Sequence, residues 1–143
     1  MQIQQLSIFV ENKSGRLAEI TEVLAVAGID IRAISVADTS DFGILRLIVD
    51  QPDEAVKVLR QAGLTVSLTN VIAMGIDDKP GEFSKAMRIL ADNLIGVEYM
   101  YAFISRDSGK AYVILRVEDN EKAIDVLRNN NIKILTAKEI YGM

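Results

Sequence analysis

The stretch Asn12-Lys13-Ser14-Gly15-Arg16-Leu17 decides the fold, because it occurs twice in the chain. It returns 66 residues later as Asp78-Lys79-Pro80-Gly81-Glu82-Phe83. Each copy follows an alternating apolar run that predicts a β-strand, at residues 4–11 and 71–77. Each copy also leads into apolar residues at helical spacing, which predict helices at residues 16–27 and 82–93. The chain therefore turns twice from a strand into a helix through a short polar loop that contains glycine.

The start of such a helix is suited to holding an anion. The N–H groups of the first helical turn have no acceptor within the helix, and a carboxylate can supply one. For Gly15 and Gly81 the plain structural alternative is a tight turn that needs the φ freedom of glycine. For Asn12 the alternative is a helix N-cap or an Asx turn, and for Lys13 and Lys79 it is a solvated side chain. The duplication with matched flanking residues favours a binding role for the loops.

The repeat extends beyond the loops. Equivalent positions lie 66 residues apart up to the second strand and 68 apart after the following hairpin, so two residues are inserted between the second and third strands. We expect a domain at residues 1–69 and another at residues 70–143, with Asn70 as the only candidate linker. The further strands are expected at residues 29–36 with a bulge or a bent entry, 44–49, 65–69, 97–105, 112–117 and 132–136, and the further helices at residues 52–62 and 120–129. A hairpin is expected at residues 38–43.

A β-α-β-β-α-β order predicts an α+β fold: two ferredoxin-like sandwiches, each an antiparallel four-stranded sheet with both helices on one face. The helix-facing residues are expected to be Leu6, Ile8, Val10, Leu45, Leu47 and Val49 in the first copy, and Ile72, Met74, Ile76, Val113, Leu115 and Val117 in the second. The opposite face is also apolar, with Phe9, Ile44, Ile48, Tyr99, Tyr101, Phe103, Tyr112 and Ile114. An apolar face of this kind predicts a cover, through a homodimer or another partner; scattered surface hydrophobes are the alternative.

Composition removes several classes of function. The net charge is −4 and there is no basic cluster, which argues against nucleic acid and against an anionic membrane as partners. The chain has no Cys and no His, so thiol nucleophiles, imidazole bases and the usual zinc ligands are missing. We therefore expect no catalysis, no metal and no cofactor. The start of the chain does not have the layout of a secretion signal and no apolar run has membrane-spanning length, so we expect a cytoplasmic protein.

The double β-α-β-β-α-β plan with these two loops resembles a tandem pair of ACT domains, the amino-acid-sensing modules of regulated metabolic enzymes. The loops match the loose pattern of Asn or Asp, any residue, Pro or Ser, Gly, any residue, apolar. The resemblance covers the whole chain and implies a free amino acid as ligand. It implies a carboxylate cradle from the amides of Gly15, Arg16 and Leu17 and of Gly81, Glu82 and Phe83, with Asn12 and Asp78 facing the ammonium group.

The resemblance also implies that the two copies join edge to edge through their second strands into an eight-stranded sheet, with ligands at the seam. Residues of those strands would then read the ligand side chain: Ile34, Ser35 and Val36 in the first copy, and Met100, Tyr101 and Ala102 in the second. The copies depart from one another within the loops, with Arg16 against Glu82 and Ser14 against Pro80. The two sites are therefore expected to differ in affinity, and one of them to be silent if the Glu82 carboxylate faces the ligand.

The leading hypothesis is a regulatory protein that binds an amino acid, forms a homodimer and acts on a partner enzyme of amino-acid metabolism. The alternative is a structural or interaction subunit of an enzyme complex that has no ligand of its own. An RNA-binding module of the same fold would need basic residues beside the sheet-face aromatics, and the acidic balance of the chain disfavours it.

Overall fold

The computed structural model describes residues 2–11, 13–38, 41–104 and 109–142 of the chain. The chain divides into two compact units. The N-terminal unit comprises Gln4–Thr69 with Ile140–Met143, and the C-terminal unit comprises Met1–Ile3 with Asn70–Glu139. Each unit thus includes a short segment from the opposite end of the chain. The assignment of one ACT domain to residues 1–69 and one to residues 70–143 stays a prediction.

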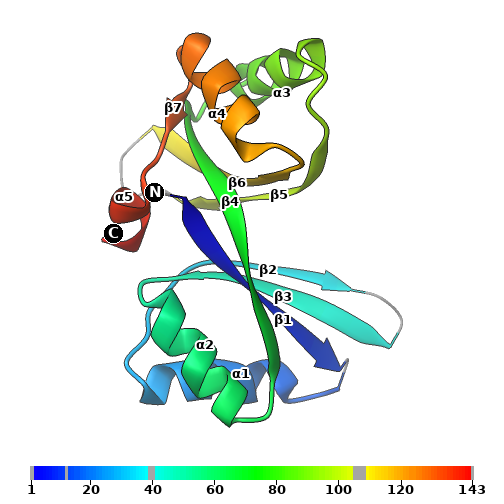
Figure 1. The fold of residues 1–143 in the computed structure, drawn as a ribbon, viewed down its shortest axis with the longest axis vertical. Coiled ribbons are helices and arrows are strands. Elements are labelled where there is room, and N and C mark those ends of the chain that lie inside the picture. The colour runs from blue at the N-terminus through cyan, green and yellow to red at the C-terminus, as the bar shows by residue number, and fades with distance from the viewer. Residues whose placement is uncertain (1, 12, 39–40, 105–108, 143) are drawn as a thin grey trace. The chain divides into compact units, whose positions relative to one another are not determined.

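The N-terminal unit has the predicted order of elements (Figure 1). In chain order they are β1 (Ile3–Glu11), α1 (Arg16–Val26), β2 (Ile31–Asp38), β3 (Phe42–Val49), α2 (Pro52–Gln61) and the first part of β4 (Thr65–Asp77). The strand order is β2-β3-β1-β4, and β3 pairs antiparallel with both β1 and β2. Helices α1 and α2 lie on one face of this sheet.

The C-terminal unit repeats the plan. Its elements are the second part of β4, then α3 (Glu82–Asp92), β5 (Val97–Ile104), β6 (Lys110–Val117), α4 (Asn120–Asn129), β7 (Lys133–Ile134) and α5 (Ala137–Tyr141). The strand order is β7-β4-β6-β5, with antiparallel pairs throughout. Both units are therefore ferredoxin-like sandwiches, and the predicted fold class is confirmed.

The number of strands differs from the prediction. Two strands were expected at residues 65–69 and 71–77, but β4 is one strand of 13 residues, so the described residues form seven strands rather than eight. The run from Thr65 to Ile72 is rich in β-branched residues and holds no glycine or proline, which explains why Asn70 stays extended rather than forming a linker.

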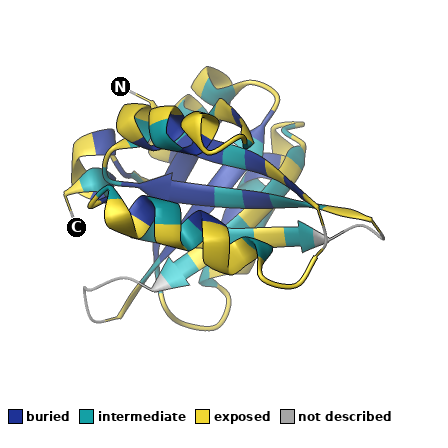
Figure 2. Cartoon of the chain, turned by 90° about the horizontal axis from the view of Figure 1, so that it is seen from below, coloured by how far each residue is buried: buried dark blue, intermediate teal, exposed yellow. Residues whose placement is uncertain are grey.

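The predicted helix-facing residues are confirmed as the two cores. The six in the first copy and the six in the second are all buried, against Ile20, Leu24 and Leu59 in one unit and Leu90 and Leu127 in the other. Figure 2 shows buried residues alternating with exposed ones along the helices and strands. Burying a Leu or Ile side chain contributes about 1.5–3 kcal/mol, so these clusters hold each sandwich together.

The opposite sheet face is less open than the sequence predicts. Ile48, Tyr112 and Ile114 are buried within the single chain, so no second chain is needed to cover them. The Tyr112 ring lies over Gly75 and meets the edge of Phe103 with ring centroids 5.5 Å apart. Phe9 remains 52% exposed and packs against Phe42, with ring centroids 5.0 Å apart.

The irregularity predicted in the second strand, a bulge or a bent entry, is confirmed. The pairing of β2 with β3 shifts register between Ile31 and Ala33, and β5 shifts against β6 between Val97 and Tyr99, 66 residues further on. Of the hairpin expected at residues 38–43, only residues 39 and 40 lie outside the described residues; β2 ends at Asp38, β3 begins at Phe42, and the two strands pair antiparallel as expected.

Candidate functional site

The two loops form equivalent turns. Gly15 and Gly81 are the N-caps of α1 and α3, with φ angles of 87° and 93°. In this left-handed region an L side chain is strained, so the turn itself requires glycine. Asn12 lies outside the described residues, but it is not the N-cap of α1, because Gly15 holds that position. A glycine N-cap supplies no side-chain oxygen, so the first helical amides must find other acceptors.

One of the three amides expected in each cradle is already used by the turn. The Arg16 N–H donates to the Lys13 carbonyl oxygen, and the Glu82 N–H donates to the Lys79 carbonyl oxygen, both at 3.3 Å. Within the described part of the chain, no backbone acceptor is recorded for the amides of Leu17 and Phe83. In each copy the amide at the second helical position is therefore not used by the backbone of the described turn.

A cavity of about 200 Å³ lies beside the first loop, where the end of β1, the start of α1 and strands β2 and β3 meet. Three residues of the predicted site, Lys13, Arg16 and Leu17, contribute to its lining. The complete lining is Val10, Glu11, Lys13, Arg16, Leu17, Val36, Gly43 and Leu45. Pockets for drug-sized molecules usually span about 300–1,000 Å³, so this cavity suits a smaller ligand.

The rim of the cavity carries charges of both signs. Lys13 Nζ lies 3.0 Å from a carboxylate oxygen of Glu11, and the Arg16 guanidinium lies 3.8 Å from the same oxygen. Arg16 also pairs with Glu19 at 3.1 Å. The hydrogen bond and charge of Lys13, assisted by Arg16, lower the pKa of Glu11 below its ordinary value. A carboxylate beside two cations offers partners for both the ammonium and the carboxylate of a zwitterion.

The walls of the cavity are apolar. Val10 and Leu45 belong to the core of the N-terminal unit and close the inner side. Leu17 and Val36 are partly exposed and stand at the entrance. The site thus combines a polar rim with an aliphatic interior, the composition typical of small-molecule pockets.

The second loop has different electrostatics. Glu82 occupies the position equivalent to Arg16 and pairs with Lys85 at 3.6 Å. Asp77 hydrogen-bonds to the Lys110 ammonium, and this contact lowers the pKa of Asp77. The Asp78 N–H donates to the Gly109 carbonyl oxygen at 2.8 Å. The second copy therefore carries a carboxylate where the first carries a guanidinium.

The other predicted site residues lie around these turns. Exposed in the two loops are Lys13, Ser14, Gly15, Asp78, Lys79, Pro80 and Gly81, and Phe83 of α3 is 42% exposed. On the second strands, Ile34 and Met100 pair with core-facing residues and lie on the helix side, whereas Ser35 and Tyr101 lie on the opposite side. Because Ser35 faces away from the helices, Val36 rather than Ser35 lines the cavity.

Four lining residues were missed as site residues by sequence reasoning. Val10 and Leu45 were assigned only to the core, and Gly43 only to a hairpin. Glu11 directly precedes the repeated loop, and its position at the end of β1 beside Lys13 is the signal that was available. Pairing of β2 with β3 brings Val36 opposite Leu45, which places both at the cavity.

Among the described residues, no group of His, Cys, Asp and Glu is arranged to hold a metal ion. No helix in the described part of the chain is long and apolar enough to cross a membrane.

Comparison with known proteins gives a family and a set of similar folds. A family model described as an ACT domain pair matches residues 1–143. A search of curated proteins gave no significant match. The crystal structure of protein BT0572 from Bacteroides thetaiotaomicron is 40% identical in sequence, with a TM-score of 0.94, and the match covers 100% of this chain and 98% of that one.

Two more distant structures share the fold. The ligand-free regulatory subunit of aspartate kinase from Thermus thermophilus is 18% identical, with a TM-score of 0.67 and coverage of 90% of this chain and 91% of that one. The regulatory subunit of aspartate kinase from Thermus flavus is 17% identical, with a TM-score of 0.63 and coverage of 90% and 92%.

Proposed function

The chain belongs to the ACT domain pair family, and from that premise we propose that it is a non-catalytic regulatory protein that binds a free amino acid. The observation that carries the proposal is the cavity beside Gly15. It brings the Leu17 amide, two cations and one carboxylate to the mouth of an aliphatic pocket. Every group of an α-amino acid finds a partner of suitable chemistry there.

The ligand carboxylate would accept hydrogen bonds from the Leu17 N–H and from Arg16 or Lys13, and its ammonium would donate to Glu11. The positive end of the α1 dipole adds to the attraction for the carboxylate. Asn12, as the family resemblance implies, would support the ammonium group. The side chain would enter between Val10, Val36 and Leu45, and those walls favour a small or medium aliphatic amino acid over a charged one.

The first loop is the better site of the two. At the second loop Glu82 replaces Arg16, so a bound carboxylate would meet a like charge instead of a guanidinium. We therefore propose that the N-terminal copy carries the tighter site, with Asp78, Lys79, Gly81 and Phe83 forming a weak or silent one.

The test is titration calorimetry of the full chain against the twenty amino acids. Aliphatic amino acids should give binding heat, and absence of heat from all twenty with folded protein would overturn the proposal. Val36→Trp, which fills the cavity entrance, should abolish binding. Ala102→Trp is the matched control, because Ala102 holds the equivalent position on β5 and is also exposed. If Ala102→Trp abolished binding and Val36→Trp did not, the tighter site would be in the C-terminal copy.

We further propose that the bound state is read by a partner enzyme of amino-acid metabolism, since the two distant structural relatives are regulatory subunits of such an enzyme. The alternative is an interaction subunit without a ligand, and the exposed Phe9–Phe42 pair favours it, because a partner chain would bury both rings. Pull-down of the partner with and without the best amino acid separates the two. Ligand-dependent capture supports regulation, and capture that ignores the ligand supports the alternative.

A further inference from the structure

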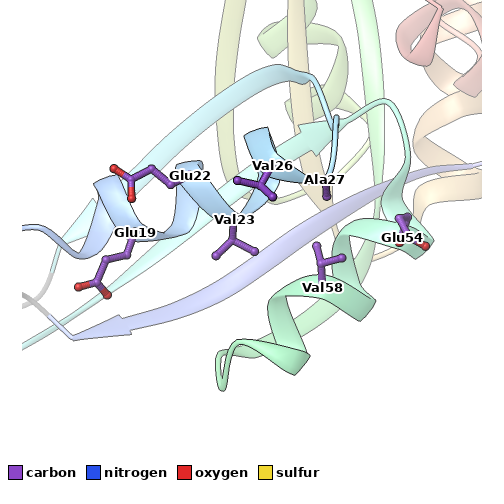
Figure 3. A pocket seen from close by; sticks show the side chains of 7 residues that line it. All are labelled: Glu19, Glu22, Val23, Val26, Ala27, Glu54 and Val58. Atoms are coloured by element: carbon purple, nitrogen blue, oxygen red, sulfur yellow. The ribbon is translucent and has the colours of Figure 1, made fainter.

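The helix side of the N-terminal unit carries a second and larger hollow, which shares no lining residue with the proposed amino-acid site. It measures about 730 Å³ and lies between α1 and α2. Its residues are Glu19, Glu22, Val23, Val26, Ala27, Glu54 and Val58, which we term the acidic helix face. Figure 3 shows Val23 of α1 and Val58 of α2 pointing toward one another across the gap between the helices.

The acidic helix face combines an apolar floor with unbalanced charge. Val26 is 91% exposed, although valine gains free energy by leaving water. Three glutamates surround the floor, and only Glu19 has a cation partner, Arg16. Glu22 and Glu54 form no ion pair with any described residue. A surface of this kind suits a partner that brings cations around an aliphatic patch.

The C-terminal unit carries the opposite charge at the same positions. Adding the repeat offset to Glu19, Glu22 and Glu54 gives Lys85, Arg88 and Lys122, so every one of the three charges is reversed. Two of the four apolar positions keep their character, because Val23 becomes Ile89 and Val58 becomes Val126, whereas Val26 becomes Asp92 and Ala27 becomes Asn93. We term these residues, with Asp92, the basic helix face: Lys85, Arg88, Ile89, Asp92, Lys122 and Val126.

The basic helix face is also accessible. Lys85, Arg88 and Lys122 are exposed, and Ile89 and Val126 are half-buried. Asp92 stands where the first copy has Val26 and pairs with Arg88 at 3.7 Å, and Lys85 pairs with Glu82 at 3.6 Å. These are exposed i,i+3 and i,i+4 pairs, which stabilise a helix only weakly because water screens them. Both lysines and the arginine can therefore turn to a stronger partner, and the three cations outnumber the two carboxylates, Glu82 and Asp92, that pair with them.

We propose that the acidic helix face of one chain docks onto the basic helix face of a second copy of the same chain. The two faces carry opposite charges at equivalent positions around aliphatic residues, so contact pairs cations with glutamates and buries the valines. Two acidic faces, or two basic faces, would repel one another. The partner is a second copy because the complementary surface is encoded in the same sequence.

The experiment compares the self-association of four full-length variants with the wild type, by sedimentation velocity over a concentration series. One variant reverses the acidic face (Glu22→Lys with Glu54→Lys), and another reverses the basic face (Arg88→Glu with Lys122→Glu). A third carries all four changes and keeps the wild-type net charge of −4. The control, Asp41→Lys with Glu118→Lys, makes the same charge change as the first variant at exposed positions outside both faces.

The wild type and the control should associate, and their association should weaken as salt is raised, because screening shortens the reach of charge. Each single-face reversal should weaken association at least about tenfold, the equivalent of losing about 1.4 kcal/mol. The variant with both reversals should associate again, because the charges of the two faces are exchanged but remain complementary. A wild type that stays monomeric overturns the proposal. Single-face reversals that associate as the wild type does, or a folded double reversal that fails to associate, overturn it too.

Discussion

At the scale of the residue, Gly15 and Gly81 are required by the backbone before any ligand is considered. A Cβ atom on either glycine would meet no atom within 4 Å, so a substitution is not opposed by crowding. Their φ angles of 87° and 93° are nevertheless strained for an L residue, at a cost of about 1–2 kcal/mol. Gly15→Ala and Gly81→Ala should each lower the free energy of unfolding by that amount in urea denaturation. Gly96→Ala is the control, because Gly96 has equal space and no positive φ; an equal loss there would contradict the explanation.

A second residue-scale prediction concerns the carboxylate of the proposed site. Lys13 holds the pKa of Glu11 below its ordinary value, so Glu11 stays charged to lower pH in the folded protein. A lowered folded pKa stabilises the fold above the unfolded pKa, and that contribution is lost as the pH falls through the folded value. Lys13→Met should raise the pKa of Glu11 toward its ordinary value, as followed by NMR of the carboxyl carbon. Lys79→Met should leave it unchanged, and an unmoved Glu11 pKa in Lys13→Met would disprove the role of Lys13.

Only the site residues that are close together in the sequence could be predicted from the sequence. Lys13, Arg16 and Leu17 sit in a repeated strand–loop–helix segment, so local pattern alone places them together. Val36 and Leu45 reach the cavity through the pairing of β2 with β3. The register of β2 against β3 depends on a bulge and on a hairpin. The sequence alone does not tell which side chains these two features bring next to one another. The hydrogen bond from the Arg16 N–H to the Lys13 carbonyl oxygen likewise depends on the turn conformation, which the residue types alone do not determine.

At the scale of the element, the two copies end their first helices differently. Gly28 after α1 has a φ of 72°, and the equivalent residue after α3 is Leu94 with a φ of 57°. The following residue closes each helix in the same way, with Ile29 N–H to Leu24 O at 3.0 Å and Ile95 N–H to Leu90 O at 2.9 Å. A left-handed closing residue is usually glycine.

Leu94→Gly should therefore raise the free energy of unfolding by about 1 kcal/mol, because it removes left-handed strain from an L residue. Little burial is lost, since Leu94 is 89% exposed. The reciprocal variant Gly28→Leu should lower stability by a similar amount. Thermal or urea unfolding of the two variants measures both changes in the free energy of unfolding. If Leu94→Gly lowered stability instead, the contacts of the leucine side chain would outweigh the strain of its left-handed backbone.

Periodicity predicted the long elements well and the short ones poorly. Helix α4 falls at the predicted residues 120–129, and α1, α2 and α3 start where glycine or proline marks them. The strand expected at residues 132–136 is present as the shorter β7, and helix α5 after it was not predicted. Its start is nevertheless marked in the sequence: the Glu139 N–H donates to Thr136 Oγ1 at 3.1 Å, the capping-box contact of a Thr followed three residues later by Glu. The apolar run before it does form a strand, β7, and only the cap that follows was overlooked.

At the scale of the whole molecule, each end of the chain belongs to the unit formed by the opposite half of the sequence. Ile140–Met143 joins the N-terminal unit, and Met1–Ile3 joins the C-terminal unit. Within the N-terminal unit, the Gln4 N–H donates to the Tyr141 hydroxyl at 2.8 Å, and the Arg32 guanidinium donates to the Tyr141 carbonyl oxygen at 3.1 Å. Burial raises the pKa of the Tyr141 phenol, which keeps the hydroxyl neutral.

Tyr141→Phe tests whether this exchange of chain ends supports the N-terminal unit. The variant keeps the ring and removes only the hydroxyl, so the partly buried Gln4 N–H loses its acceptor, at a cost of about 1 kcal/mol. Hydrogen exchange should show faster opening of the Gln4 amide and of core amides such as Leu6 and Leu45. The amides around Leu90 and Leu127 serve as the internal reference, because both residues belong to the C-terminal unit. If protection fell there instead, or in neither unit, the last residues of the chain would not stabilise the unit formed by its first half.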